Sequence, residues 1–167
     1  MNKKQDLPWD NPRFRTWIAV ARAEKAIVRA LSKSLEPLGL KIAQLDMLMN
    51  LYRHPGQSQH DLARRLLVAR SNITMLLPQM EAQGLVRRES DASDKRVLRL
   101  YLTTEGEARL MRALAVYTQL IDRVMAQSTP AQCEAMGEQM RRISEALTEE
   151  EPAAPVDKNA ATRPASA

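Results

Sequence analysis

Apolar residues recur every three or four positions along most of the chain, and this spacing predicts a mainly helical protein. A first apolar series ends around Pro37 and Gly39, two residues that stop helices. A second series ends at the His-Pro-Gly sequence of residues 54–56. The apolar positions of these two predicted helices are Phe14, Trp17, Ile18, Ala21, Val28, Leu31, Leu35 and Leu38, then Ile42, Leu45, Leu48, Met49 and Tyr52.

Two shorter helices are predicted next. In "SQHDLARRLL", Ser58 and Asp61 have the spacing of a capping box, so a third helix begins there. A fourth helix covers about 70–83 and ends at Gly84. The inward positions of the two helices are Leu62, Ala63 and Leu66, then Ile73, Leu76, Leu77 and Met80.

The pattern then changes from helical to extended. The segments "LVRRES" and "VLRLYLT" predict two antiparallel strands. Asp94, Lys95 and Arg96 lie at the tip of the hairpin between them. Two helices joined by a turn and followed by such a hairpin have the layout of a winged helix. The expected fold is therefore mainly α with a small β-hairpin wing, a winged helix-turn-helix with further helices on both sides.

The last two predicted helices each carry a narrow apolar seam. The first is capped by Thr103 or Thr104 and the second begins at Pro130. Such seams pack against other helices, either within one chain or between subunits, and spacing alone does not decide between these. The seam residues are Leu110, Leu114, Tyr117, Ile121 and Val124, then Cys133, Met136, Met140, Ile143 and Leu147.

The predicted boundaries give one domain with two extensions. Residues 1–12 are expected to form a flexible arm, and residues 13–148 a single winged-helix and dimerisation domain. Its DNA-binding lobe spans about 42–103. The segment 149–167 has almost no large apolar residue and is expected to be disordered.

Charge points to a polyanionic partner. The 167-residue chain has a net charge of +5, and residues 53–99 hold nine bases against five acids. The second helix of a winged-helix pair fits the major groove of DNA, and the basic hairpin tip can reach phosphates or the minor groove. Near the start of the fourth helix, five side chains could touch bases or phosphates, or only face solvent: Arg70, Ser71, Asn72, Thr74 and Met75. Ser71 could instead cap the helix.

Other functions find little support in the sequence. It has no Gly-rich phosphate loop and no catalytic constellation, so neither an enzyme nor a cofactor is expected. His54 and His60 lack metal-ligand spacing, and no metal site is expected. Cys133 lies on an apolar seam near a helix start, which favours a structural role over redox sensing. The sequence has no apolar signal core and no membrane span, so a cytoplasmic protein is expected.

The sequences "SQHDLARRLLVARSNIT" and "MEAQGLVRRESDASDKRVLRLYLTTEG" resemble the MarR (multiple antibiotic resistance regulator) family of bacterial transcription factors. The flanking helices resemble the family's helical dimerisation region, so the resemblance covers about residues 13–148. Two positions depart from the family pattern, since Leu67 stands where a turn Gly is frequent and Ala69 where a polar residue is frequent. Pro78 is also unusual, because it interrupts the predicted recognition helix and puts the docking geometry on DNA in doubt.

The resemblance implies a homodimer on a palindromic operator, with Arg96 in the minor groove, Asp94 holding it, and Arg88 paired with a wing acid. It also implies a small-molecule effector site, for which Trp17 and Asp46 are candidates, although Trp17 could be core and Asp46 could face solvent. The expected function is a ligand-responsive repressor. The alternative is a winged-helix module that binds an acidic protein partner.

Overall fold

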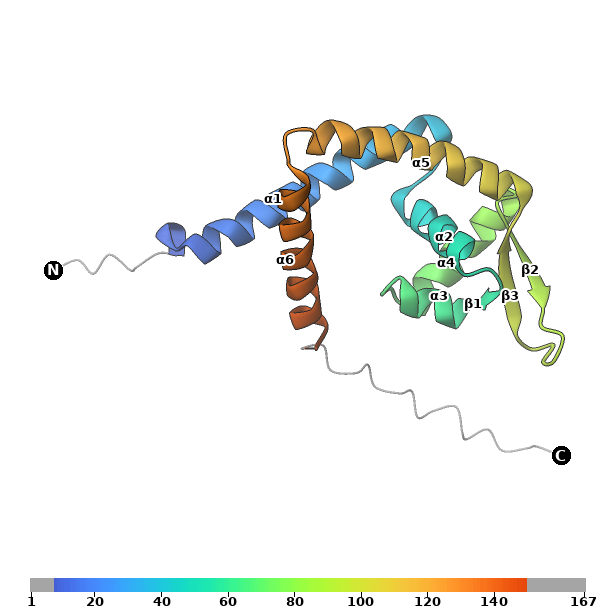
Figure 1. The fold of residues 1–167 in the computed structure, drawn as a ribbon. Helices are drawn as coiled ribbons and strands as arrows, with labels where there is room; N and C mark the ends of the chain where they lie inside the picture. Colours follow the sequence, from blue (N-terminus) through green and yellow to red (C-terminus); the bar gives the residue numbers. More distant parts are fainter. Residues whose placement is uncertain (1–7, 150–167) are drawn as a thin grey trace. The chain divides into compact units, whose positions relative to one another are not determined.

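The computed structural model describes the backbone of residues 8–149 and the side chains of residues 9–147. It confirms the expected fold class, because helices dominate and one small antiparallel sheet follows the fourth helix (Figure 1). In chain order the helices are α1 (Pro12–Leu35), α2 (Ile42–Arg53), α3 (Gln59–Arg65), α4 (Arg70–Ala82), α5 (Thr104–Met125) and α6 (Pro130–Glu149). Short 3-10 helices occupy Pro8–Asp10 and Glu36–Leu38.

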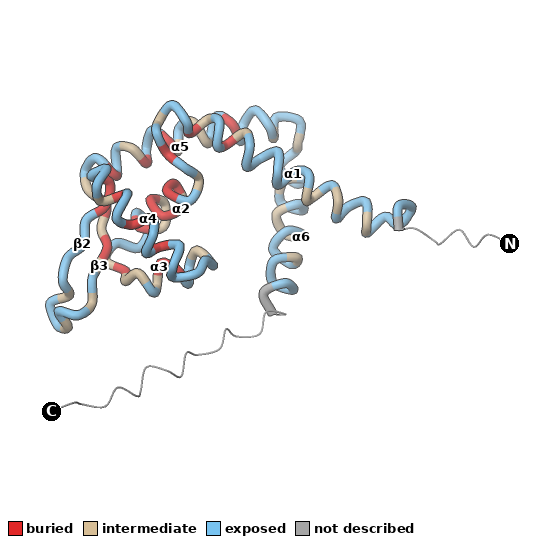
Figure 2. Tube along the Cα trace, turned by 180° about the vertical axis from the view of Figure 1, so that it is seen from behind, coloured by how far each residue is buried: buried red, intermediate tan, exposed pale blue. Residues whose placement is uncertain are grey.

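The chain divides into two compact units, residues 1–123 and residues 124–167. The first unit contains the core, which the buried positions of Figure 2 trace through α2, α4, the base of the sheet and one side of α5. Leu48, Leu62 and Leu77 are fully buried there, as the helical spacing predicts. Most of the predicted arm and tail lies outside the described residues. Within the arm, Trp9 packs edge-on against Phe14.

The sheet has three strands where the sequence predicts two. Strands β2 (Val86–Ser90) and β3 (Leu98–Leu102) form the expected hairpin. A third strand, β1 (Gln57–Ser58), pairs antiparallel with β3 on its other edge. Two residues are too few for an alternating pattern, and Ser58 also caps α3, so no sequence signal marks this strand. Because of β1, the start of α3 is fixed to the wing.

Side-chain caps fix the starts of α3 and α5. The backbone N–H of Asp61 donates to the Ser58 hydroxyl at 3.1 Å, and the Ser58 N–H donates to the Asp61 carboxylate at 3.3 Å, as predicted. Of the two predicted caps of α5, Thr103 is the one used: its hydroxyl accepts from the Gly106 N–H at 2.9 Å. The helices therefore begin where the sequence places them.

A buried amide joins α2 to the end of α4. The Gln44 side chain accepts from the Lys41 N–H at 2.9 Å and donates to the Gln83 side-chain oxygen at 3.1 Å. Gln44 is buried, so both polar ends of its amide have partners where water does not reach. This contact ties the C-terminal end of α4 to the helix behind it.

The turn between α3 and α4 contains strained backbone. Leu67 has φ of 52°, and it is the only non-glycine residue with positive φ in the part of the chain that the structure describes. Its side chain is 80% exposed, so packing does not compensate for the conformation. The departure from the frequent glycine at this position therefore has a local conformational cost.

Leu67→Gly is expected to stabilise the protein by about 1 kcal/mol, because glycine adopts positive φ without the steric cost of a Cβ atom. Urea unfolding monitored by circular dichroism measures the difference. Leu67→Ala is the control, since it removes the exposed side chain and keeps the strain. If Leu67→Ala stabilises as much as Leu67→Gly, the backbone conformation is not the cause.

Apolar side chains also remain uncovered along the long helices. Trp17 is 52% exposed, so the interpretation of Trp17 as a core residue is wrong for a single chain. The expected seams of α5 and α6 are similarly open at their outer positions. The large apolar side chains that are exposed on these helices, within the seams and beside them, are Ile27 and Val28 on α1, Met111, Ile121 and Val124 on α5, and Met136, Met140 and Leu147 on α6.

Candidate nucleic-acid interface

The first two turns of α4 present the predicted side chains to solvent. Arg70, Ser71, Asn72, Thr74 and Met75 are all exposed. Ala69 is the N-cap and makes no side-chain cap. Ser71 lies inside the helix, so its predicted alternative role as the cap is wrong. The Thr74 hydroxyl donates to the Arg70 carbonyl at 3.0 Å.

Asp91 organises the loop at the tip of the wing. Its carboxylate accepts from the Ser93 N–H at 2.9 Å, from the Asp94 N–H at 3.1 Å and from Arg99 Nε at 2.6 Å. Hydrogen bonds from Ser93 and then Arg99 hold the pKa of Asp91 well below its ordinary value. Asp91 is not among the residues selected from the sequence. The signal was present, because an Asp two residues before a Ser can accept a hydrogen bond from the backbone N–H of that Ser and so form an Asx-turn.

Beyond this anchor, the wing tip carries an exposed arginine. The Asp94 carboxylate accepts from the Arg96 backbone N–H at 3.0 Å and from Arg96 Nε at 3.2 Å. The expected contact between these two residues is therefore present. The Arg96 side chain is still 93% exposed, and Lys95 beside it is exposed as well. Asp94 thus orients a guanidinium that is open to a ligand.

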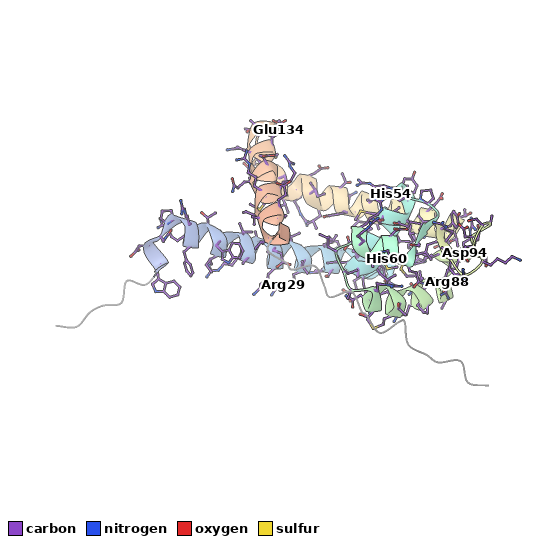
Figure 3. All side chains as sticks on the ribbon, turned by 90° about the horizontal axis from the view of Figure 1, so that it is seen from below. Arg29, His54, His60, Arg88, Asp94 and Glu134 are labelled. Carbon is purple, nitrogen blue, oxygen red and sulfur yellow. The ribbon has the colours of Figure 1, made fainter. Side chains whose placement is uncertain are left out.

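Arg88 does not pair with a wing acid, and that prediction is wrong. Its Nε donates to Glu81 of α4 at 2.7 Å, and a second ion-pair contact joins the same two groups. Glu81 lies on α4 and Arg88 on β2, so their separation of seven residues in the sequence does not indicate that the two side chains meet. The pair clamps the hairpin to α4. Figure 3 labels Arg88 and Asp94 on the sheet side and His60 on α3.

Ion pairing leaves few free cations in the lobe. Each of the five acids in residues 53–99 pairs with an arginine: Asp61 with Arg64, Glu81 with Arg88, Glu89 with Arg87, Asp91 with Arg99 and Asp94 with Arg96. Arg53, Arg65, Arg70 and Lys95 form no ion pair with the described residues. Part of the excess positive charge of the lobe therefore lies at the start of α4, on Arg70, and at the wing tip, on Lys95.

The two candidates for an effector site do not share a cavity. Asp46 lines a cavity of about 430 Å³ together with Val68, Asn72 and Met75. Burial raises the pKa of the Asp46 carboxyl, so this residue does not simply face solvent. Trp17 is not among the residues that line this cavity.

The histidines and the cysteine are not gathered as metal ligands in the described part of the chain. In the described ranges, no three His, Cys, Asp or Glu side chains are grouped as metal ligands would be. His54 contacts Arg65 at 3.5 Å, and Cys133 is half-buried on α6. None of the described helices is long and apolar enough to cross a membrane.

Comparison with known proteins identifies the family. The MarR family profile matches residues 38–97, which include α2 to the wing. The HTH-type transcriptional repressor Mb2911 of Mycobacterium bovis is 35% identical over 102 residues, which are 61% of this chain and 73% of that protein. The chain belongs to the MarR family.

Two further MarR-type comparisons cover more of the chain. The homoprotocatechuate degradative operon repressor of Escherichia coli is 30% identical over 132 residues, 79% of this chain and 84% of that protein. The transcriptional repressor CouR, solved with a 23-mer DNA duplex, superposes with a TM-score of 0.75 at 27% identity, covering 84% of this chain and 99% of that one. The winged-helix fold of the family therefore extends beyond the matched lobe to the long helices.

Proposed function

We propose that the protein is a transcriptional repressor that binds double-stranded DNA sequence-specifically as a homodimer in the cytoplasm. One observation carries the proposal. Arg70 at the start of α4 and Arg96 at the wing tip border the same groove, so two basic side chains from separate elements are available to one anionic ligand. Both side chains are exposed. The relatives named as repressors, and CouR bound to a DNA duplex, support the same assignment.

In the proposed complex, α4 enters the major groove and the wing reaches the adjacent minor groove. Arg70 and Asn72 carry the donors and acceptors that read base edges, since guanidinium suits guanine and amide suits adenine. Ser71 and Thr74 contact phosphates, and Met75 supplies apolar contact beside them.

The wing contributes the second contact. Arg96, oriented by Asp94, enters the minor groove, where a narrow and electronegative channel favours a guanidinium. Lys95 binds the backbone beside it. Arg88 acts by positioning the hairpin against α4 through Glu81, because its own charge is already neutralised.

The open apolar seams support the homodimer. Large side chains left uncovered on three helices mark an interface when a single chain cannot bury them. Two copies related by a twofold axis would read a palindromic operator whose half-sites lie about 10 base pairs apart. A small molecule in the Asp46 cavity would act on α4 directly, because Asn72 and Met75 line the same space.

Fluorescence anisotropy tests the proposal with duplexes from the region upstream of the protein's own gene and with shuffled duplexes of equal composition. Tight, salt-sensitive binding to one upstream duplex is expected, at least a thousandfold above the shuffled controls. Equal and weak binding to every duplex would reject a specific regulator and favour a protein-interaction module.

Arg96→Ala is expected to lower operator affinity about tenfold, and to flatten the slope of log affinity against log salt by about 0.9 if its contact is mainly with phosphate. A loss of affinity without a change in slope would place Arg96 on a base edge. Arg141→Ala is the matched control, since Arg141 is also exposed and paired to an acid of its own segment, Glu138. Unchanged affinity and slope in Arg96→Ala would remove the wing tip from the interface.

A further inference from the structure

A polar groove of about 350 Å³ separates the wing from the start of α4. Three of the segments that line it each contribute one basic or titratable side chain: His60 from α3, Arg70 from α4 and Arg96 from the wing loop. The other lining residues are Ser58, Gln59, Val97 and Leu98. His60 is exposed on this groove and has no role in the packing of the core.

The proposed docking on DNA places one strand of the duplex between α4 and the wing. A major groove and the adjacent minor groove of a duplex are separated by one sugar-phosphate strand. If α4 occupies the first and the wing the second, that strand must lie in the space between them. The groove with Arg70 and Arg96 among its lining residues lies between the start of α4 and the wing loop.

We propose that this groove is a phosphodiester site and that His60 is its third ligand, a phosphate contact beyond the assigned residues of α4 and the wing. The inference rests on the proposed function, because the phosphodiester is that of the bound DNA strand. Arg70 has no acid partner in the described chain, so its guanidinium is available to the phosphate. His60 closes the site from the α3 side.

Charged side chains surround His60 on the groove and on its own helix. Arg70 and Arg96 line the groove with it, from α4 and the wing loop. On its own helix, Asp61 is engaged by Ser58 and Arg64. Across the groove, Asp94 is engaged by Arg96, and Asp91 behind it is held by Arg99.

A phosphate in the groove would place a negative charge beside the His60 ring. The anion neutralises the two guanidinium groups and accepts a hydrogen bond from the imidazolium, so DNA binding is coupled to proton uptake by His60. Imidazole is the side chain whose ordinary titration falls between about pH 5 and 8. Affinity for DNA therefore rises as the pH falls. The pKa values of Asp61 and Asp91 are held below their ordinary range, so these carboxylates stay charged across that interval.

The experiment compares operator affinity at pH 8.5 and pH 5.5 for the wild type, His60→Gln and His54→Gln. The protein has two histidines, and His54 contacts Arg65 outside the groove, so His54→Gln is a matched control. For the wild type and His54→Gln, affinity is expected to increase between threefold and tenfold at the lower pH, about the effect of a pKa change of up to one unit. The salt slope should steepen by up to about 0.9. His60→Gln should lose both changes.

His60→Lys is the second variant, because a permanent charge should give the higher affinity at both pH values and remove the pH dependence. Specific binding that is independent of pH in the wild type would overturn the inference and leave the proposed function intact. If His60→Gln retains the pH dependence, the inference is also overturned and the proposed function is left intact. Absence of specific DNA binding at either pH would overturn the inference and the proposed function together.

Discussion

Replacing Gly106 by alanine is expected to destabilise the fold by about 3 kcal/mol or more, the upper range for overpacking a tight site. A Cβ atom at this position would overlap the carbonyl oxygen of Leu85 and lie 2.9 Å from its carbonyl carbon. Both neighbours are backbone atoms, so no rotamer change relieves the clash. The same carbonyl accepts from the Thr103 N–H at 3.1 Å, so moving Leu85 would also break the contact that docks α5 onto the lobe.

Gly137→Ala is the control for this experiment, because Gly137 lies inside α6 with only the end of the Arg141 side chain near, at 3.7 Å. There alanine should stabilise the helix by about 1 kcal/mol, since glycine in a helix interior costs about that much. Urea unfolding curves of the two variants should therefore shift in opposite directions. Equal shifts would show that the approach of Leu85 to Gly106 is not tight in solution.

Pro78→Ala is expected to stabilise the protein by about 2 kcal/mol. Proline inside a helix costs about 3 kcal/mol through a missing hydrogen bond and ring contacts, and its restriction of the unfolded chain returns about 1 kcal/mol. α4 continues unbroken through Pro78, so the helix accepts this cost without ending. Alanine would restore a donor to the Thr74 carbonyl.

Thermal unfolding followed by circular dichroism measures this gain, and Gln79→Ala is the control at the neighbouring exposed position. The control should change stability by less than about 0.5 kcal/mol. A Pro78→Ala variant no more stable than Gln79→Ala would mean that α4 has adapted fully to the proline. Operator affinity of the same variant would then tell whether the proline shapes the helix that docks on DNA.

Sequence patterns predicted the elements of the lobe well because local chemistry determines them. Ser58 and Asp61 cap each other within three residues, and the hairpin from Val86 to Leu102 follows from two apolar segments around a polar tip. The contact of Asp94 with Arg96 is equally local. In each case the partners are close in sequence, so spacing is sufficient to find them.

Contacts between distant segments were harder to predict. β1 gains its partner about forty residues later in the chain. The Arg88–Glu81 pair spans only seven residues, but it joins a strand to a helix, so no single periodicity relates the two positions. His60 could not be placed beside Arg70 and Arg96 from the sequence, because the groove that they line exists only after the wing folds against α3. The exposure of Trp17 is likewise not indicated by its helical spacing, which it shares with buried positions such as Leu31 and Leu35. Such features need coordinates.

The amide pair of Gln44 and Gln83 has a consequence for how the protein responds to its medium. Neither group carries a net charge, so their bond is insensitive to acidity and to dissolved ions within the ordinary range. The attachment of α4 to α2 through this pair therefore stays constant as acidity and salt change. In the proposed complex, shifts in affinity with proton or salt concentration would then arise from the charged side chains of α4 and the wing.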